Sequence, residues 1–249
     1  MPLITNAQHD SIKGMGLGLE INTMGNSPYV DFNSVLYYGY TGASGEAGTT
    51  SNKSFSLGVR GYFDLANNFS LKIRAGIRSS NVSVTISDTS GSRSSAVLSE
   101  TQNGYYLVAG CQQNIRINKF THLHVGLDFD FTYYANLVQS INYNQTSSYY
   151  NGYTYVTSAY SETDKYTTPG GVTFGIGPAI GFDFKLGKHI SLGSEATAAL
   201  LYETLGGQQT FTETNSMSGT STQPFNFSLK TNGWTDSGII ASVYLMLAL

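Results

Sequence analysis

The sequence predicts an all-β protein, a transmembrane antiparallel up-and-down β-barrel of eight strands. Three observations predict this fold: segments in which apolar and polar residues alternate, connections that are alternately short and long, and few charged residues. Charged residues make up 12% of the chain, about half the share of an average soluble domain. No stretch approaches the roughly 20 apolar residues of a membrane helix, and only helices and closed barrels satisfy every backbone hydrogen bond in lipid.

The first three alternating segments are residues 14–23, about 53–65, and a segment that begins at Phe69. In each, one parity is apolar and the other is polar or small, which is typical of lipid-facing barrel strands. The first segment alternates Met, Leu and Ile with glycines, Glu20 and Asn22. In the third, Lys72, Arg74 and Arg78 all lie on the parity opposite the apolar one. We therefore expect the charged side chains to face the lumen.

The fourth segment, about 104–113, has the weakest alternation, and the fifth, 122–137, has the strongest. The sixth, seventh and eighth are 171–186, 190–203 and 237–249. No charged residue lies on the apolar parity in the cores of the eight segments, because Arg or Lys at the lipid midplane costs about 2–4 kcal/mol. Pro178 lies on the outward parity, and since proline cannot donate to a ladder we expect a bulge near it.

The connections support the same topology independently. Short linkers at 66–68, about 115–119 and 187–189 join strands two to three, four to five and six to seven. Long segments rich in Ser, Thr, Asn, Gly and Tyr cover about 24–52, 88–103, 138–170 and 204–236, and we expect external loops there. This alternation of short and long connections predicts one barrel domain over 1–249 with periplasmic termini. Ten strands are the alternative, because 34–40 (SVLYYGY) has the composition of a further strand.

Aromatic residues fall where interfacial girdles are expected. Phe63, Phe69, Phe120 and Phe184 flank the short turns, and a second set lies towards the long segments: Phe55, Tyr105, Tyr133, Phe174 and Tyr202. In strand pattern and loop rhythm, nearly the whole chain resembles the small outer-membrane barrel family that includes the OmpA membrane domain, OmpX and OmpW. The resemblance implies a bacterial outer-membrane location. One departure is the end of the chain, Leu249, where that family usually has an aromatic residue.

The polar parity supplies a set of inward charges of both signs. An eight-stranded barrel has an interior just wide enough for side chains to fill, and buried charges require partners. We therefore predict a lumen network that closes the barrel, and a narrow gated conduit is the alternative. The residues predicted for this network are Glu20, Arg60, Asp64, Lys72, Arg74, Arg78, Asp128, Asp130, Asp183, Lys185, Glu195 and Glu203.

Several kinds of chemistry are not expected. The net charge of −3 offers no basic face for nucleic acid, and the lone Cys111 forms no internal disulfide. Gly14, Gly16 and Gly18 lie inside a strand, so they do not form a phosphate loop. His122 and His124 could ligate a metal, but a hydrogen-bonded lumen pair is the preferred interpretation, and we predict neither metal nor cofactor. Residues 1–12 lack a secretory signal, so we expect the mature form of an exported chain.

The segment 138–170 is rich in tyrosine among small polar residues, a composition that makes adaptable binding surfaces. A hairpin that prolongs the barrel with cross-strand tyrosine pairs is an equal alternative. The binding candidates are Tyr143, Tyr149, Tyr150, Tyr153, Tyr155 and Tyr160.

We expect a non-enzymatic barrel whose external loops serve surface interaction or envelope integrity. Its expected partners are outer-membrane lipid and lipopolysaccharide, together with an extracellular partner reached through the loops. A narrow channel for small hydrophobic or polar solutes is the first alternative function. A lipid-modifying barrel enzyme is the second, although no outer-rim Ser and His pair supports it, since Ser194 is outward and the histidines are inward.

Overall fold

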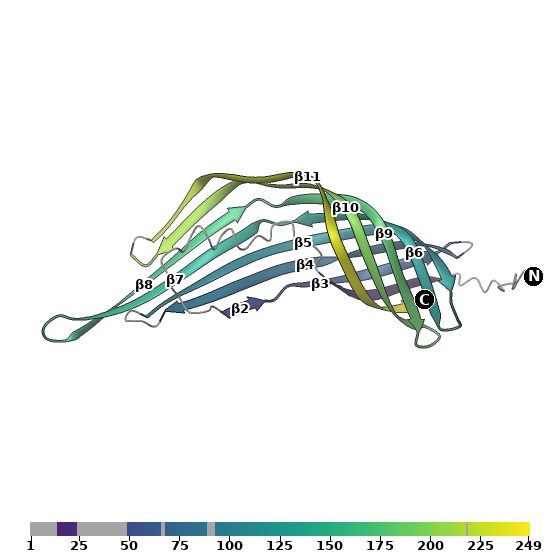
Figure 1. Ribbon diagram of the computed structural model, residues 1–249, viewed down its shortest axis with the longest axis horizontal. Helices are drawn as coiled ribbons and strands as arrows, with labels where there is room; N and C mark the ends of the chain where they lie inside the picture. Colours follow the sequence, from purple (N-terminus) through teal and green to yellow (C-terminus); the bar gives the residue numbers. More distant parts are fainter. Residues whose placement is uncertain (1–13, 24–48, 66–67, 89–92, 218) are drawn as a thin grey trace, which may run out of the picture.

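The structure is a computed structural model that describes residues 14–23, 49–65, 68–88, 93–217 and 219–249. Antiparallel β-strands form almost all of this part of the chain (Figure 1). No helix within these ranges is long and apolar enough to cross a membrane. The strands are β1 Met15–Asn22, β2 Thr49–Asn52, β3 Phe55–Asp64, β4 Phe69–Asp88, β5 Arg93–Arg116, β6 Thr121–Tyr134, β7 Leu137–Tyr150, β8 Tyr155–Thr168, β9 Gly171–Lys185, β10 Ile190–Asn215 and β11 Gly219–Ala248.

Eight of these strands pair in a ring. The pairings run β1–β3–β4–β5–β6–β9–β10–β11, and β11 returns to β1 with Leu17 opposite Leu247 and Asn22 opposite Ser242. The turns that join β5 to β6 and β9 to β10, the end of β3, the start of β1 and the end of β11 all lie at one end of this ring (Figure 1). Each predicted alternating segment corresponds to one strand of the ring. The alternative extra strand at 34–40 lies outside the described residues.

Two strands of the ring, β6 and β9, are continued by β7 and β8 beyond the end of the ring that lies opposite to the short turns, after a short break in each. β6 and β7 are separated by Ala135 and Asn136, and β8 and β9 by Pro169 and Gly170. The pairing of β7 with β8 continues the register of β6 with β9, from Leu137 opposite Thr168 to Tyr134 opposite Gly171. The Asn136 side chain accepts a hydrogen bond from the Gly170 N–H at 3.2 Å. β6–β7 and β8–β9 are therefore two long interrupted strands.

Where they are described, the long segments predicted as loops are mostly strands, with short connections at 151–154, 169–170 and 216–217. Residues 93–103 belong to β5, 137–168 form the β7–β8 hairpin, and 204–215 and 219–236 extend β10 and β11. Together with β2 and the end of β4 they form an upper sheet in the order β2–β4–β5–β7–β8–β10–β11. In Figure 1 this upper sheet projects far beyond the ring. The hairpin alternative for 138–170 is confirmed as a backbone arrangement.

The outer face changes character between the ring and the upper sheet. In the ring, most outward side chains are large and apolar, with Leu19 69% exposed. A band of aromatic residues ends this zone: Phe131, Phe174, Tyr202 and Trp234 occupy successive ladder positions, and Tyr105 stacks on Tyr133. Above the band, outward side chains pair through polar groups across the strands, as in Ser99–Ser140, Asn142–Thr163, Thr212–Thr222 and Thr214–Thr220.

Inward glycines make room for inward aromatic rings. A Cβ atom at Gly58 or Gly76 would meet the Tyr106 hydroxyl, and one at Gly193 would meet the Tyr244 ring. On β1, a Cβ atom at Gly16 would meet Tyr62 instead. The ring interior is therefore filled by pairing residues that have no side chain with bulky residues on neighbouring strands.

The bulge expected near Pro178 is not found in β9, whose pairings with β6 and β10 both keep their register; a register shift occurs instead between β10 and β11. β6 pairs through Pro178 without a shift in register, whereas the β10–β11 register shifts between Ala198 and Leu200. The Ser237 hydroxyl accepts a hydrogen bond from the Ala199 N–H at 2.8 Å, and Gly238 has a positive φ of 62°. The extra residue of this bulge is therefore on β11, where Ser237 and Gly238 lie opposite the single residue Ala199 of β10.

Candidate functional site: a buried ion network in the lumen

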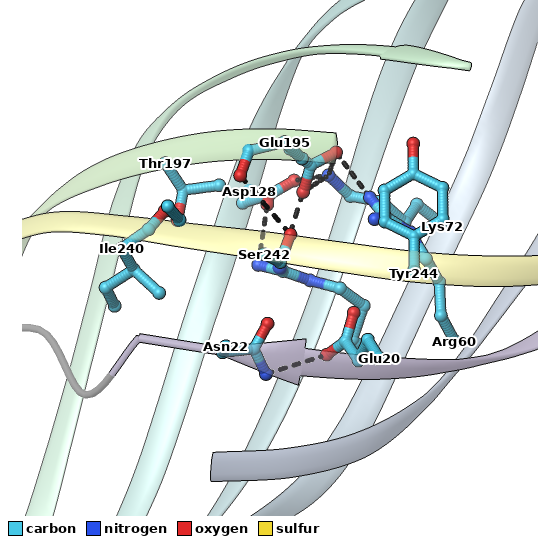
Figure 2. A network of polar contacts seen from close by, with 12 residues as sticks. Glu20, Asn22, Arg60, Lys72, Asp128, Glu195, Thr197, Ile240, Ser242 and Tyr244 are labelled. Atoms are coloured by element: carbon cyan, nitrogen blue, oxygen red, sulfur yellow. Dashed lines mark hydrogen bonds and ion pairs between the residues drawn. The ribbon is translucent and has the colours of Figure 1, made fainter. Parts of the chain in front are cut away.

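The centre of the lumen contains a buried ion network formed by four strands that are distant in sequence. Arg60 comes from β3, Lys72 and Arg74 from β4, Asp128 from β6 and Glu195 from β10. The inward parity of each strand puts these side chains inside the ring, and the registers bring them to a similar height. Figure 2 shows Arg60, Lys72, Asp128 and Glu195 converging between the strands of the ring.

Glu195 is the centre of this network, and its side chain is 0% exposed. Its carboxylate contacts the Arg60 guanidinium, lies 2.9 Å from Lys72 Nζ, and lies 3.3 Å from Arg74 Nη1. Asp128 is the second anion, at 2.8 Å from Lys72 Nζ and 3.1 Å from Arg74 Nη2. Three cations thus share two carboxylates, which satisfies the requirement that buried charges be paired.

His124 links the centre of the network to the turn-side part of the lumen. Its Nε2 atom lies 3.1 Å from Glu195 Oε2, and its Nδ1 atom lies 3.5 Å from Asp183 Oδ2. The Tyr244 hydroxyl donates to Asp183 at 2.7 Å, and the Arg60 guanidinium lies 3.9 Å from the centroid of the Tyr244 ring. These contacts extend the network from β10 across β6, β9 and β11.

A second polar layer lies on the side of the network towards the upper sheet. The Tyr106 hydroxyl donates to Glu20 Oε1 at 2.8 Å and accepts from Asn22 Nδ2 at 2.8 Å. Arg78 lies 3.8 Å from Asp130 and over the Tyr106 ring. Every residue named in this layer is buried.

Three predicted network residues lie away from the centre. Asp64 accepts a hydrogen bond from Ser70 near the short turns, and Lys185 is partly exposed at the same end. Glu203 is buried on β10, eight residues along the chain from Glu195 towards the upper sheet. These three residues lie on the inward parity, as predicted. However, they do not contact the ion network around Glu195.

The two histidines differ in environment. His124 belongs to the network, whereas His122 lies nearer the turns opposite Arg116 and Asp183. Among the described residues, no group of three His, Cys, Asp or Glu side chains has the arrangement of a metal site. Ser194 faces outward between Phe182 and Val243, on the opposite side of the sheet from His124.

The candidate tyrosines divide into two groups. Tyr149, Tyr150, Tyr153 and Tyr155 are exposed at the tip of the β7–β8 hairpin, with Tyr153 90% exposed. Tyr143 and Tyr160 are partly buried lower on the hairpin, where their ring centroids lie 6.4 Å apart. Tyr160 also donates to Glu162 at 2.7 Å. Only the first group is arranged as an accessible surface.

The residues predicted for the network did not include Tyr106, His124 and Asn22. His124 was predicted to be one of a hydrogen-bonded histidine pair in the lumen, whereas its partners are Glu195 and Asp183. Tyr106 lies in the weakest alternating segment, and only its position on the inward parity indicated its role. His124 lies on the same inward parity as Asp128, and this shared parity would have been sufficient to include His124 in the predicted network. Asn22 could not be separated from other inward polar residues without the strand register.

Comparisons with known proteins give only distant likenesses. No family model and no curated protein matches the chain. Among solved structures, CarO of Acinetobacter baumannii is 13% identical, with 95% of this chain and 98% of that chain covered and a TM-score of 0.33. A major outer membrane protein from Thermus thermophilus is 9% identical, with 94% and 99% covered and a TM-score of 0.39. The CymD monoaromatic hydrocarbon channel is 9% identical, with 95% and 89% covered and a TM-score of 0.29.

Membership of the family that includes the OmpA membrane domain, OmpX and OmpW stays a prediction. The architecture itself rests on the chain's own residues. A ring of antiparallel strands with an apolar outer face, an aromatic band and a charged interior is a β-barrel of the outer-membrane class.

Proposed function

We propose that this protein is inserted in the bacterial outer membrane as a closed, non-enzymatic scaffold that presents its upper sheet outside the cell. The observation that carries this proposal is the ion network around Glu195, which occupies the centre of the lumen with side chains at most 5% exposed. A lumen filled by paired charges leaves the outside surfaces, above all the β7–β8 hairpin, as the part available to partners.

The proposed orientation places the short turns in the periplasm and the hairpins outside. The ring zone supports this placement in a bilayer: β10 crosses from Ile190 to Tyr202 and β11 from Trp234 to Leu247, slightly longer than the roughly 9–11 residues of a tilted membrane strand. Above Tyr202 the outward side chains become polar, which suits an aqueous environment.

Epitope accessibility on intact cells tests location and orientation together. An epitope inserted after Asn151, at the hairpin tip, should bind antibody on intact cells. The matched epitope inserted after Gly187, in a short turn, should bind only after permeabilisation. Binding at Gly187 on intact cells, with none at Asn151, would reverse the orientation, and binding at neither site after permeabilisation of membranes would contradict insertion.

The closed lumen is tested by conductance in planar bilayers. The wild-type protein should give no stable single-channel steps, because three cations and two carboxylates hold the centre closed. Replacing Glu195 and Asp128 together by alanine leaves Arg60, Lys72 and Arg74 without these partners, and we expect anion-selective steps. Stable steps from the wild type that persist when residues 147–158 of the hairpin are deleted would contradict the scaffold.

A narrow conduit is the second candidate, and one observation favours it. Glu20 Oε2, Arg74 Nε and Arg78 Nε are buried and have no protein hydrogen-bond partner. Buried polar atoms of this kind are normally hydrated, and water bound to these atoms would connect the two polar layers. A proton or water flux measured in vesicles without ion conductance would favour this conduit over the fully closed scaffold.

The non-enzymatic part of the proposal has its own support. Ser194 and His124 lie on opposite faces of the β-sheet, so they do not form a nucleophile and base pair. Lipid A isolated from cells that express the protein should be unchanged in mass.

A further inference from the structure

Two of the short turns form a basic rim on one side of the ring. Residues 115–121 and 185–190 contain Arg116, Lys119, Lys185 and Lys188 and no aspartate or glutamate. The remaining short turn, 65–69, carries no charge. Arg116, Lys119 and Lys188 are exposed, and among the described residues none of them has a carboxylate within ion-pair distance.

The two turns lie side by side because β6 pairs with β9. Thr121 is opposite Phe184, and the Lys185 N–H donates to the Phe120 carbonyl at 2.8 Å. Each turn is closed by its own backbone hydrogen bonds, from Ile117 to Thr121 and from Leu186 to Ile190. The cations of the two turns therefore share one short stretch of the rim. Arg116 lies on the inward parity of β5, opposite His122, so we give the name basic turn patch to Lys119 and Lys188, which lie in the turns themselves.

Exposed apolar side chains surround this patch. Ile115, Ile117, Phe120, Phe184 and Leu186 are all exposed, and the Phe120 and Phe184 ring centroids lie 6.3 Å apart. Lys119 Nζ lies 4.8 Å from the centroid of the Phe120 ring. Cations at a rim with apolar and aromatic residues immediately beside them match the boundary between phosphate groups and acyl chains.

We propose that the basic turn patch binds the phosphate of an anionic phospholipid in the leaflet on the turn side of the membrane. The proposal rests on membrane insertion of the ring, which the proposed function includes. The cations contact the headgroup phosphate, and Phe120, Phe184 and Leu186 contact the acyl chains. Charge complementarity selects an anionic over a zwitterionic lipid, and the adjoining apolar residues select a lipid over free phosphate.

Fluorescence quenching by brominated lipid tests this proposal in the full chain. Trp234, the only tryptophan, lies at the opposite aromatic band, so Trp234→Phe combined with Phe120→Trp places a single reporter beside the patch. The protein is reconstituted in phosphatidylcholine vesicles that contain a minor share of either brominated phosphatidylglycerol or brominated phosphatidylcholine. Brominated phosphatidylglycerol should quench the reporter more strongly at equal mole fraction.

The decisive variant is Lys119→Gln with Lys188→Gln. Each cation near an anionic surface contributes about fivefold in affinity, so the double change should lower the preference for phosphatidylglycerol by up to about 25-fold. The matched control, Lys165→Gln with Lys230→Gln, removes the same charge from exposed positions in the upper sheet and should keep the preference. Inorganic phosphate added to the vesicles should not reduce the quenching by brominated phosphatidylglycerol.

Each contrary result identifies what fails. Equal quenching by the two lipids, or a preference that the patch variant retains, overturns the phospholipid site while leaving membrane insertion intact. Competition by inorganic phosphate overturns the lipid as ligand. The absence of quenching by either brominated lipid contradicts membrane insertion itself, and therefore the proposed function.

Discussion

The ring and the upper sheet are built from the same strands, but they present opposite surfaces. On β10, Glu195 is buried in an ion network and Leu192 faces outward, whereas further along the same strand Glu213 is only partly buried and Thr212 faces outward. Charges in the ring are confined to the interior, while Lys165 lies exposed on the outer face of the upper sheet. A change of solvent along the strands, from lipid to water, accounts for this difference.

The largest expected effect comes from removing the central carboxylate. Glu195→Gln leaves Arg60, Lys72 and Arg74 incompletely paired inside the ring, so the free energy of unfolding should fall by about 3–5 kcal/mol. Glu213→Gln, on the same strand in the upper sheet, should change it by about 0.5 kcal/mol or less. Urea unfolding in detergent micelles measures both, and equal losses would show that the network is not a special feature of the ring.

The second-largest expected effect is the cost of a new charge on the outer face, which should be high in the ring and low in the upper sheet. Leu245→Arg places a cation between Leu19 and Leu192 at the level of the ring and should cost about 2–4 kcal/mol in a lipid bilayer. Asn144→Arg, at an exposed position of β7, should cost about 0.5 kcal/mol or less. The free energy of folding into lipid vesicles is the measurement, and similar values for the two variants would remove the distinction between the faces.

Glycine substitutions probe the packing of the two interiors. A Cβ atom at Gly76 would meet the Leu57 carbonyl and the Tyr106 hydroxyl, whereas one at Gly233 on β11 meets nothing within 4 Å. Gly76→Ala should therefore lower the free energy of unfolding by about 1–3 kcal/mol, and Gly233→Ala should lower it by no more than about 0.5 kcal/mol. Thermal unfolding of the two variants in one detergent is a direct comparison, and a greater loss for Gly233→Ala would contradict the packing described.

The smallest expected effect is a pH dependence confined to the upper sheet. Burial, followed by the nearby Glu162 and Glu213 carboxylates, raises the pKa of Asp164 above its usual value. The folded hairpin then holds a proton that the unfolded chain has released, so its stability falls as pH rises between the ordinary aspartate pKa and the raised one. Hydrogen exchange of β8 should slow in Asp164→Asn at neutral pH, and faster exchange in that variant would contradict the sign.

Residue periodicity predicted the ring well because lipid outside and charge inside produce the greatest contrast between parities. Even the weak segment around Tyr106 and Val108 has the predicted orientation, with both side chains buried inside. The strands of the upper sheet were predicted as loops because both of their faces carry polar residues. Ser140 and Gln139, for example, are neighbours on opposite faces and are both polar, so period two leaves no signal there.

The composition of the ion network was predictable, but its contacts were not. Parity places Glu195, Lys72 and Asp64 in the same lumen, yet only the register between strands decides that Lys72 contacts Glu195 while Asp64 contacts Ser70. These contacts join residues far apart in sequence, and a shift of two positions along one strand would preserve every parity while exchanging the partners.

The central claim, a lipid boundary at the aromatic band, is tested most directly by spin labels on the two outer faces. In a Cys111→Ala background, labels are attached at Leu245→Cys and Asn144→Cys and the protein is reconstituted in vesicles. The label at 245 should be accessible to oxygen dissolved in the bilayer and protected from a water-soluble nickel reagent, and the label at 144 should show the opposite pattern. A label at 245 that is as accessible to the nickel reagent as the label at 144 would contradict the claim.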